Sequence, residues 1–212
     1  MNIIIAGSSG LIGSLLLKRV MGHDLTLIGR RGNSAAPGDA RQIIGDHADW
    51  SSLMAGILYD IAICMLGSTM AQAGSKAAFA AVDHGAVIAF AQAAYAAGAR
   101  QFMMVSSVGA NPKAGNFYLA TKGQSEAGVR AIGFERVDIF RPGLLRGQRG
   151  NDRRLAERLM IKLSPITKVF TPPIFDRYRA INAADVADAM AGLVGKPDHG
   201  VFVHHNREML PA

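Results

Sequence analysis

The start of the chain predicts a β-strand, a glycine-rich turn and an α-helix in direct succession. The apolar run from residue 3 to residue 6 forms the strand, and glycines follow at positions 7, 10 and 13. The first glycine permits a tight turn, the second lets backbone approach a ligand, and the third lets the helix pack on the strand. Free backbone N–H groups and the positive end of the helix dipole then suit a pyrophosphate. The residues expected to bind it are Gly7, Ser9, Gly10, Leu11, Ile12 and Gly13.

Short apolar runs alternate with helical patterns along the whole chain, which predicts an α/β fold. Because these short runs alternate with helices, we expect a parallel sheet covered on both faces, a doubly wound arrangement of about seven strands. Residues 30–40 are rich in Gly, Pro and Asn and predict a loop in place of a helix. The expected strands are 3–6, 24–28, 41–44, 60–66, 101–105, 136–140 and 201–204, and the expected helices 11–21, 51–55, 76–97, 117–132, 151–163 and 184–193.

The length of 212 residues suits one domain, 1–212. Beyond residue 141 the strand and helix pattern loosens into a basic helix and a proline-rich loop. We expect a small C-terminal substrate cap there, at about 144–183.

The net charge of +7 indicates either attraction to anions or a solvated basic surface. Basic residues concentrate in one region, but no aromatic residue stands between positions 146 and 162 to stack on bases. We therefore do not expect nucleic acid as a partner. The residues of this basic region are Arg146, Arg149, Arg153, Arg154, Arg158 and Lys162.

The only cysteine, Cys64, stands in an apolar run and is expected to be a buried strand residue. A disulfide within the chain is excluded, which favours a reducing compartment. We find no signal peptide and no stretch long enough to span a membrane, so the expected location is cytoplasmic, with no membrane partner. His204 and His205 lack a second cluster of ligands at metal-binding spacing, so no metal is expected.

The end of the second expected strand indicates the type of dinucleotide. Folds that bind NAD usually place an acid there to hold the ribose hydroxyls. Here Arg30 and Arg31 follow the strand, and two guanidinium groups suit a ribose 2′-phosphate. The alternative is a pair of surface arginines; we expect NADP(H). Asp46, after the third strand, would either lie beside the adenine amino group or cap a turn.

A serine doublet and a Tyr-Lys pair could carry proton chemistry. Ser106 and Ser107 end an apolar strand, and Tyr118 and Lys122 stand one helical turn apart on one face. A lysine ammonium lowers the pKa of a neighbouring tyrosine from its ordinary value of about 10. The tyrosine could then give a proton to a carbonyl oxygen as hydride arrives, or accept it in reverse. The alternative is a chance pair on the surface.

Two further features have structural alternatives. Pro142 and Gly143 follow a strand and could present backbone groups to a ligand at the carboxyl edge of the sheet, or could simply end the strand. The alanine-rich helix 76–97 is expected to pack on the sheet, and its second role could be a homodimer or partner face. Asp83 and His84, within it, are expected to form a polar face.

Taken in order, these motifs resemble the atypical short-chain dehydrogenase/reductase superfamily, in the subgroup that the Tat-interacting tumour-suppressor oxidoreductase typifies. The resemblance covers nearly the whole chain and implies a Rossmann core that binds NADP(H). It implies Ser107, Tyr118 and Lys122 as the catalytic triad, with Ser107 preferred to Ser106 because the second serine of such a doublet is usually active. Asp83 is nearest to the fourth, asparagine position, which has no clear match. The resemblance also implies cofactor contacts at Leu66, Gly67, Ser68, Pro142 and Gly143.

These observations predict an NADP(H)-dependent oxidoreductase that interconverts a carbonyl and an alcohol on a small substrate. The short cap does not suit a large nucleotide sugar. The alternative is a non-catalytic regulatory protein that senses NADP(H) and binds a protein partner.

Overall fold

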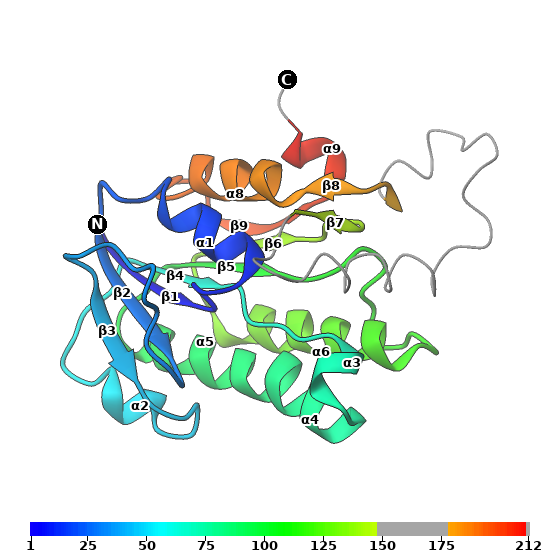
Figure 1. The fold of residues 1–212 in the computed structure, drawn as a ribbon, viewed down its shortest axis with the longest axis horizontal. Helices are drawn as coiled ribbons and strands as arrows, with labels where there is room; N and C mark the ends of the chain where they lie inside the picture. The colour runs from blue at the N-terminus through cyan, green and yellow to red at the C-terminus, as the bar shows by residue number, and fades with distance from the viewer. Residues whose placement is uncertain (148–177, 211–212) are drawn as a thin grey trace.

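A computed structural model describes residues 1–147 and 178–210 of the chain (Figure 1). Its centre is a seven-stranded sheet in the order β3-β2-β1-β4-β5-β6-β9, and every neighbouring pair is parallel. The predicted Rossmann-like α/β fold is therefore confirmed. The strands are β1 (Asn2–Ala6), β2 (Asp24–Gly29), β3 (Arg41–Ile44), β4 (Ile61–Cys64), β5 (Gln101–Val105), β6 (Arg136–Phe140) and β9 (Gly200–His204).

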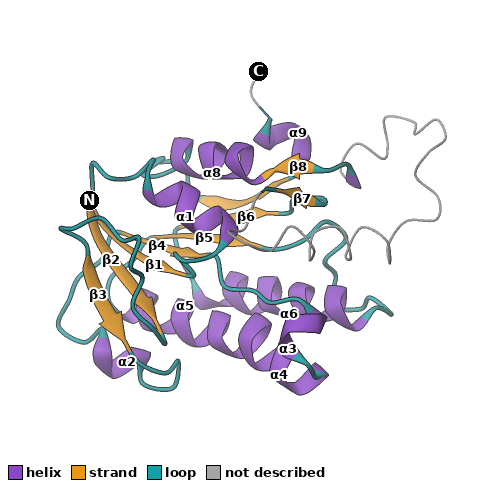
Figure 2. Ribbon diagram, viewed as in Figure 1, coloured by secondary structure: helices purple, strands orange, loops and turns teal. Residues whose placement is uncertain are grey.

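Helices form one layer on each side of the sheet (Figure 2). Figure 1 shows α1 and α8 on one face and α5 and α6 on the other, the doubly wound arrangement that the sequence predicted. The helical elements are α1 (Leu11–Leu17), α2 (Trp50–Leu53), α3 (Met70–Ala73), α4 (Lys76–Ala80), the π-helical turn η1 (Ala81–Ala86), α5 (Val87–Ala96), α6 (Phe117–Ile132), α8 (Ala183–Gly192) and α9 (Asn206–Met209).

The first strand shows why uninterrupted apolar runs mark this sheet. Successive side chains of a strand point to opposite faces. Ile3 packs with α1 and α8 on one side, whereas Ile4 packs with α5 on the other, and both are fully buried. Because both faces are covered, no position in the strand favours a polar residue.

Most element boundaries agree with the sequence to within a few residues, and the loop at 30–40 is confirmed. The first helix was expected to reach residue 21 but ends at Leu17. Just beyond it, the Arg19 N–H donates to the Leu16 carbonyl, an i→i−3 hydrogen bond that tightens the last turn. The sequence did not predict α3, α9 or the short parallel pair of β7 (Leu145–Arg146) with β8 (Ile181–Asn182).

The alanine-rich segment is confirmed as one long helical stretch that packs on the sheet, with Val87, Phe90 and Ala91 buried. The expectation that no stretch is long enough to span a membrane was wrong. Among the described residues, Lys76–Ala96 meets that test by length and composition. Its buried side chains pack in the core with β4 and β5, which accounts for its apolar character.

The expected helix 151–163 lies outside the described residues, as do the basic residues from 149 to 162 and most of the expected cap. The two described ends of that cap region lie side by side, because Leu145 pairs with Ile181 and Arg146 with Asn182.

Candidate functional site

The glycine turn after β1 has a backbone that larger residues could not adopt. Gly7 has φ +84°, and a Cβ there would lie 2.6 Å from the Met65 carbonyl carbon. A Cβ at Gly13 would collide with the Gly7 carbonyl oxygen and would lie 2.8 Å from the Ser8 Cα. Both glycines therefore permit close backbone packing, as predicted.

The amino end of α1 begins at this turn. Gly10 stands at the N-cap with extended backbone, and no side chain caps the helix. The first N–H groups of a helix have no acceptor within the helix. Those of Leu11, Ile12 and Gly13 are thus available to an anion.

The turn also lies where the strand order reverses. β1 stands between β2 and β4, and the Met65 N–H, just after β4, donates to the Ala6 carbonyl at 2.8 Å. In open α/β sheets, ligands bind outside the carboxyl ends of the strands at such a reversal.

The side chains of Arg30 and Arg31 are exposed in the loop after β2. Asp46, after β3, contacts its neighbours in the chain: its Oδ1 lies 2.7 Å from His47 Nδ1 and accepts a weak hydrogen bond from the Ala48 N–H. Sequence reasoning missed Asn33, whose Nδ2 donates to Ser8 Oγ at 3.1 Å and joins this loop to the glycine turn.

The two adjacent serines have different environments. Ser106 is buried, and its hydroxyl donates to Glu126 Oε1 at 2.5 Å. Ser107 is half-buried, and among the described residues its hydroxyl contacts only the Val108 carbonyl, at 3.4 Å. The Ser107 hydroxyl is therefore the one available to a ligand.

Glu126 anchors this end of the sheet. It is buried, and its Oε2 lies 2.5 Å from Arg141 Nη2, just beyond β6. Its Oε1 also accepts from Arg141 Nε at 2.9 Å. Glu126 thus ties α6 to the ends of β5 and β6.

The loop after β5 lies against the first turns of α6. The Asn111 N–H donates to the Leu119 carbonyl at 3.2 Å. A Cβ at Gly123 would collide with the Asn111 carbonyl carbon and Pro112 nitrogen, so glycine is needed for this approach. The contact brings the loop that carries Ser107 onto the helix that carries Tyr118.

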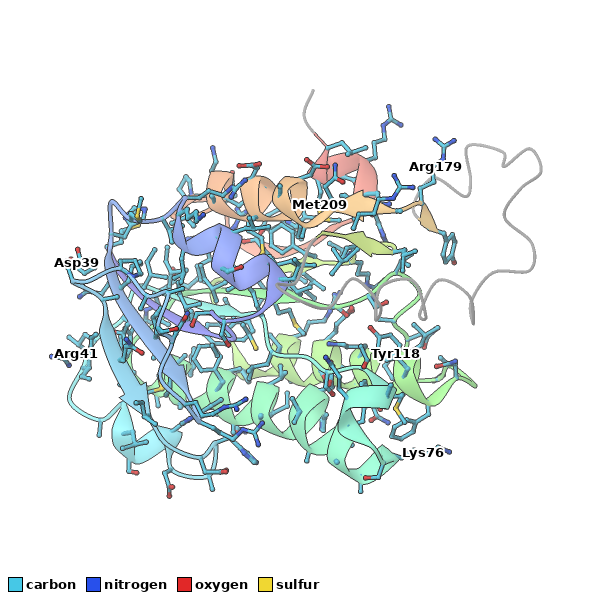
Figure 3. The ribbon with its side chains drawn as sticks, viewed as in Figure 1. Asp39, Arg41, Lys76, Tyr118, Arg179 and Met209 are labelled. Carbon is cyan, nitrogen blue, oxygen red and sulfur yellow. The ribbon has the colours of Figure 1, made fainter. Side chains whose placement is uncertain are left out.

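Tyr118 and Lys122 stand one turn apart in α6. Tyr118 is half-buried near the amino end of the helix (Figure 3). Its ring centroid lies 5.4 Å from that of Phe79. Among the described residues, no side chain or backbone group forms a hydrogen bond with its hydroxyl. The Lys122 side chain is only 6% exposed, and its Nζ lies 2.7 Å from Asp83 Oδ1.

The expectation that Asp83 belongs to a polar face was wrong. Asp83 is 1% exposed and faces Lys122 and Ser68. Burial alone would lower the pKa of Lys122, but attraction to Asp83 and then to Tyr118 outweighs it, so the pKa lies above its ordinary value. Lys122 is thus a buried cation.

The predicted cofactor contacts after β4 and β6 differ in availability. Leu66 is half-buried and Gly67 is exposed, whereas the N–H and hydroxyl of Ser68 both donate to Asp83 Oδ2. The Pro142 carbonyl accepts from the Val108 N–H at 3.1 Å, and the Gly143 N–H donates to Asn206 Oδ1 at 2.9 Å. The Pro142 carbonyl and the Gly143 N–H thus both form hydrogen bonds within the fold.

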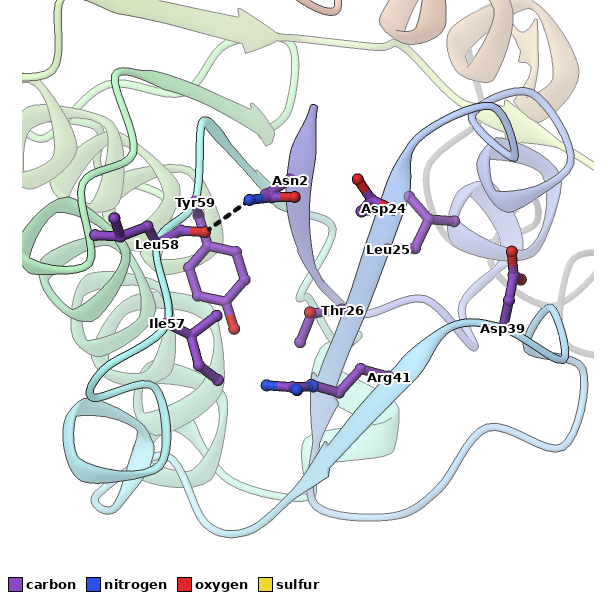
Figure 4. A pocket seen from close by; sticks show the side chains of 9 residues that line it. All are labelled: Asn2, Asp24, Leu25, Thr26, Asp39, Arg41, Ile57, Leu58 and Tyr59. Atoms are coloured by element: carbon purple, nitrogen blue, oxygen red, sulfur yellow. Dashed lines mark hydrogen bonds between the residues drawn. The ribbon is translucent and has the colours of Figure 1, made fainter.

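A cavity of about 320 Å³ lies at the other edge of the sheet, at the amino ends of β1, β2 and β3 (Figure 4). Thr26, Arg41 and Tyr59 turn toward one another across it, and burial raises the pKa of the Tyr59 hydroxyl. Figure 3 shows Arg41 and Tyr118 on opposite sides of the molecule, so this cavity is not part of the candidate site.

The described residues contain no group of three His, Cys, Asp or Glu that could hold a metal ion. His204 is engaged elsewhere: its Nε2 lies 2.9 Å from Asp138 Oδ1, and its ring stacks on Phe140.

Among proteins of known sequence, rat (Rattus norvegicus) HTATIP2 is 35% identical over 162 residues, which span 72% of this chain and 66% of the rat protein, just under two thirds. The mitochondrial protein fmp52 of Emericella nidulans is 34% identical, over 72% of this chain and 70% of its own length. The match with HTATIP2 confirms the resemblance inferred from the motifs.

The names of the FMP52 relatives correct one expectation. Six of them are described as mitochondrial, which contradicts the cytoplasmic location predicted here. That prediction depended only on features that the sequence lacked.

Among solved structures, MoeE5 in complex with UDP-glucose and NAD has a TM-score of 0.71 and 17% identity, over 96% of this chain and 75% of MoeE5. At this identity the likeness supports the fold alone. The family model "NAD dependent epimerase/dehydratase family" matches residues 3–169, and this membership supports a nicotinamide dinucleotide as the cofactor and an oxidoreductase-like function. The chain belongs to the NAD dependent epimerase/dehydratase family.

Proposed function

We propose that this protein is an NADP(H)-dependent oxidoreductase that interconverts a carbonyl and an alcohol on a small substrate. The observation that carries the proposal is the buried, charged Lys122 one helical turn after Tyr118. A lysine cation next to a tyrosine stabilises the anion that forms when the tyrosine gives up its proton.

The residues present fit a dinucleotide. The amino end of α1 is uncapped, and the backbone at Gly7 and Gly13 leaves no room for a Cβ. When bound, the dinucleotide supplies or accepts the hydride. The residues proposed to hold it are Gly7, Ser9, Gly10, Leu11, Ile12, Gly13, Arg30, Arg31, Leu66, Gly67 and Ser68.

Each residue of the triad has a distinct role in the proposal. Tyr118 gives a proton to the substrate oxygen, or takes it in reverse. Ser107 holds that oxygen, because its hydroxyl has only a weak contact within the protein, whereas the Ser106 hydroxyl is bound to Glu126. An ammonium group has three N–H donors. Lys122 forms an ion pair with Asp83, and its N–H donors are proposed to serve Tyr118 and a ribose hydroxyl.

NADP(H) is proposed over NAD(H) because Arg30 and Arg31 are both exposed after β2, where a ribose 2′-phosphate would need cationic partners. A small substrate is proposed because the cap expected at about 144–183 is too short to suit a large nucleotide sugar.

Replacement of Tyr118 tests the chemistry. In Tyr118→Phe, we expect kcat for NADPH-dependent reduction of a carbonyl panel to fall by about 10²- to 10⁴-fold, the usual contribution of a general acid or base. The Kd for NADPH should stay within a few-fold of the wild-type value, since the ring remains. Turnover that survives this change refutes the mechanism. NADPH binding without any wild-type turnover favours the non-catalytic sensor instead.

A further inference from the structure

The long helical stretch on one face of the sheet contains a π-helical turn, η1 (Ala81–Ala86), between α4 and α5. Such turns are rare and recur at functional sites. Asp83 stands in this turn. Its main-chain carbonyl accepts a hydrogen bond from the Ser125 hydroxyl at 2.6 Å, which ties the turn to α6, the helix of Tyr118 and Lys122.

The Asp83 carboxylate binds two other parts of the candidate site at once. Its Oδ2 accepts from the Ser68 N–H at 2.8 Å and from the Ser68 hydroxyl at 2.9 Å, while its Oδ1 lies 2.7 Å from Lys122 Nζ. A Cβ on Gly67 would lie 3.2 Å from Lys122 Nζ and 3.3 Å from Asp83 Oδ1. The loop after β4 therefore packs directly over the ion pair.

We propose that Asp83 is a positioning residue that holds the Lys122 ammonium beside Tyr118 and, with the same carboxylate, holds the Gly67–Ser68 loop against it. Asp83 touches neither substrate nor cofactor in this proposal and acts through Lys122 and Ser68. The inference rests on the proposed function, because it assigns Asp83 a part in that same site.

The charges around Lys122 show what removal of Asp83 would do. The titratable groups that influence its ammonium are Asp83, Tyr118 and Cys64. Burial raises the pKa of the Cys64 thiol to about 12, so this group stays neutral at ordinary pH. Asp83 is therefore the anion that offsets burial. Without it, burial dominates, and Lys122 is expected to lose its proton at a lower pH.

The first test is the Lys122 titration in Asp83→Asn. The Lys122 ¹³Cε resonance can be followed from pH 6 to 11 in protein labelled with ¹³C-lysine. It is assigned by comparison with Lys122→Met. We expect the titration to move down by about 1–3 pH units, the range for loss of a close opposite charge. The alkaline limb of the kcat/KM profile should move in the same direction. Asp83→Glu retains the carboxylate and should keep both near the wild-type values.

Ser68→Ala is the matched variant for the loop, because it removes one hydrogen bond to Asp83 and leaves the ion pair. We expect an unchanged Lys122 titration and a few-fold higher Kd for NADPH.

If Asp83→Asn folds poorly, thermal unfolding of the Asp83→Asn/Lys122→Met double variant replaces the titration. A Tm above that of Asp83→Asn alone supports the pairing, since the double variant buries no lone ammonium.

Two results overturn different claims. An unchanged Lys122 titration in Asp83→Asn, or a double variant no more stable than Asp83→Asn, overturns the role of Asp83 even where the wild type reduces carbonyls. Absence of any wild-type turnover overturns the proposed function, and the NMR titration still reports on the Asp83–Lys122 pair.

Discussion

The carboxylate of Asp138, in the middle of β6, is fully buried and accepts hydrogen bonds from three side chains. Its Oδ2 accepts from Gln101 Nε2 at 2.8 Å and from Arg136 Nε at 2.7 Å. Its Oδ1 accepts from Arg136 Nη2 at 2.9 Å and lies 2.9 Å from His204 Nε2. This group joins β5, β6 and β9, so its loss should weaken the whole edge of the sheet.

The cost of Asp138→Asn follows from this geometry. Each carboxylate oxygen has two partners, so whichever oxygen becomes an amide NH₂ leaves two donors without an acceptor. A hydrogen bond to a charged group contributes about 1.5–3 kcal/mol, and removal of one partner of a buried ion pair costs about 3–5 kcal/mol. Because Arg136 remains buried and charged, we expect the free energy of unfolding to fall by about 3–5 kcal/mol.

Urea unfolding at pH 7, followed by the fluorescence of the single, buried Trp50, measures this change. Asp198→Asn is the control. It also removes a carboxylate partner of Arg136, 3.4 Å from Nη1, but the Asp198 side chain is 70% exposed. It should cost at most about 1 kcal/mol, as exposed pairs do. A loss below about 1 kcal/mol in Asp138→Asn would refute the argument that unpaired buried donors dominate.

The same group predicts a pH dependence. Burial alone would raise the pKa of Asp138, but the hydrogen bonds from His204, Arg136 and Gln101 outweigh it and hold the pKa below its ordinary value. A depressed carboxyl pKa stabilises the fold above the unfolded-state value of about 3.9, and this stabilisation is lost as the pH falls through the folded-state pKa. The difference between wild type and Asp138→Asn should therefore be full at pH 7 and shrink below about pH 4.

Three further changes test the candidate site. Arg30→Ala combined with Arg31→Ala should weaken NADPH binding by about 10-fold or more in a fluorescence titration, because charge-assisted hydrogen bonds are lost, and equal weakening for NADH would contradict the NADP(H) assignment. Gly13→Ala should lower the Tm and abolish dinucleotide binding, whereas Gly22→Ala, where a Cβ meets nothing within 4 Å, should do neither. Ser107→Ala should lower kcat with little change in Tm, and a large loss of stability would indicate a structural role instead.

Short-range features of the chain were sufficient to predict much of the fold. The glycine turn could be recognised because the backbone at Gly7, with φ +84°, restricts that position to glycine. The strands could be recognised because burial on both faces leaves uninterrupted apolar runs, of which Ile3 to Ala6 is one. The pairing of Tyr118 with Lys122 follows from helical spacing alone.

Features that depend on contacts between distant segments were not predictable. Asp83 stands among alanines, and only the fold brings Lys122 and Ser68 to its carboxylate. Ser106 and Ser107 have the same side chain, and the family resemblance alone favoured Ser107; only the fold brings Ser106 to Glu126 of α6.

The sequence by itself therefore determined the parallel sheet and the glycine turn, because glycine conformation and hydrophobic periodicity are local properties. It also indicated the candidate triad, through helical spacing and the family resemblance. Tertiary structure alone decided which serine stays available and which anion keeps Lys122 charged. It also decided that the Gly143 N–H is used by Asn206. These outcomes depend on which polar groups meet inside the protein, where each buried charge or donor needs a partner.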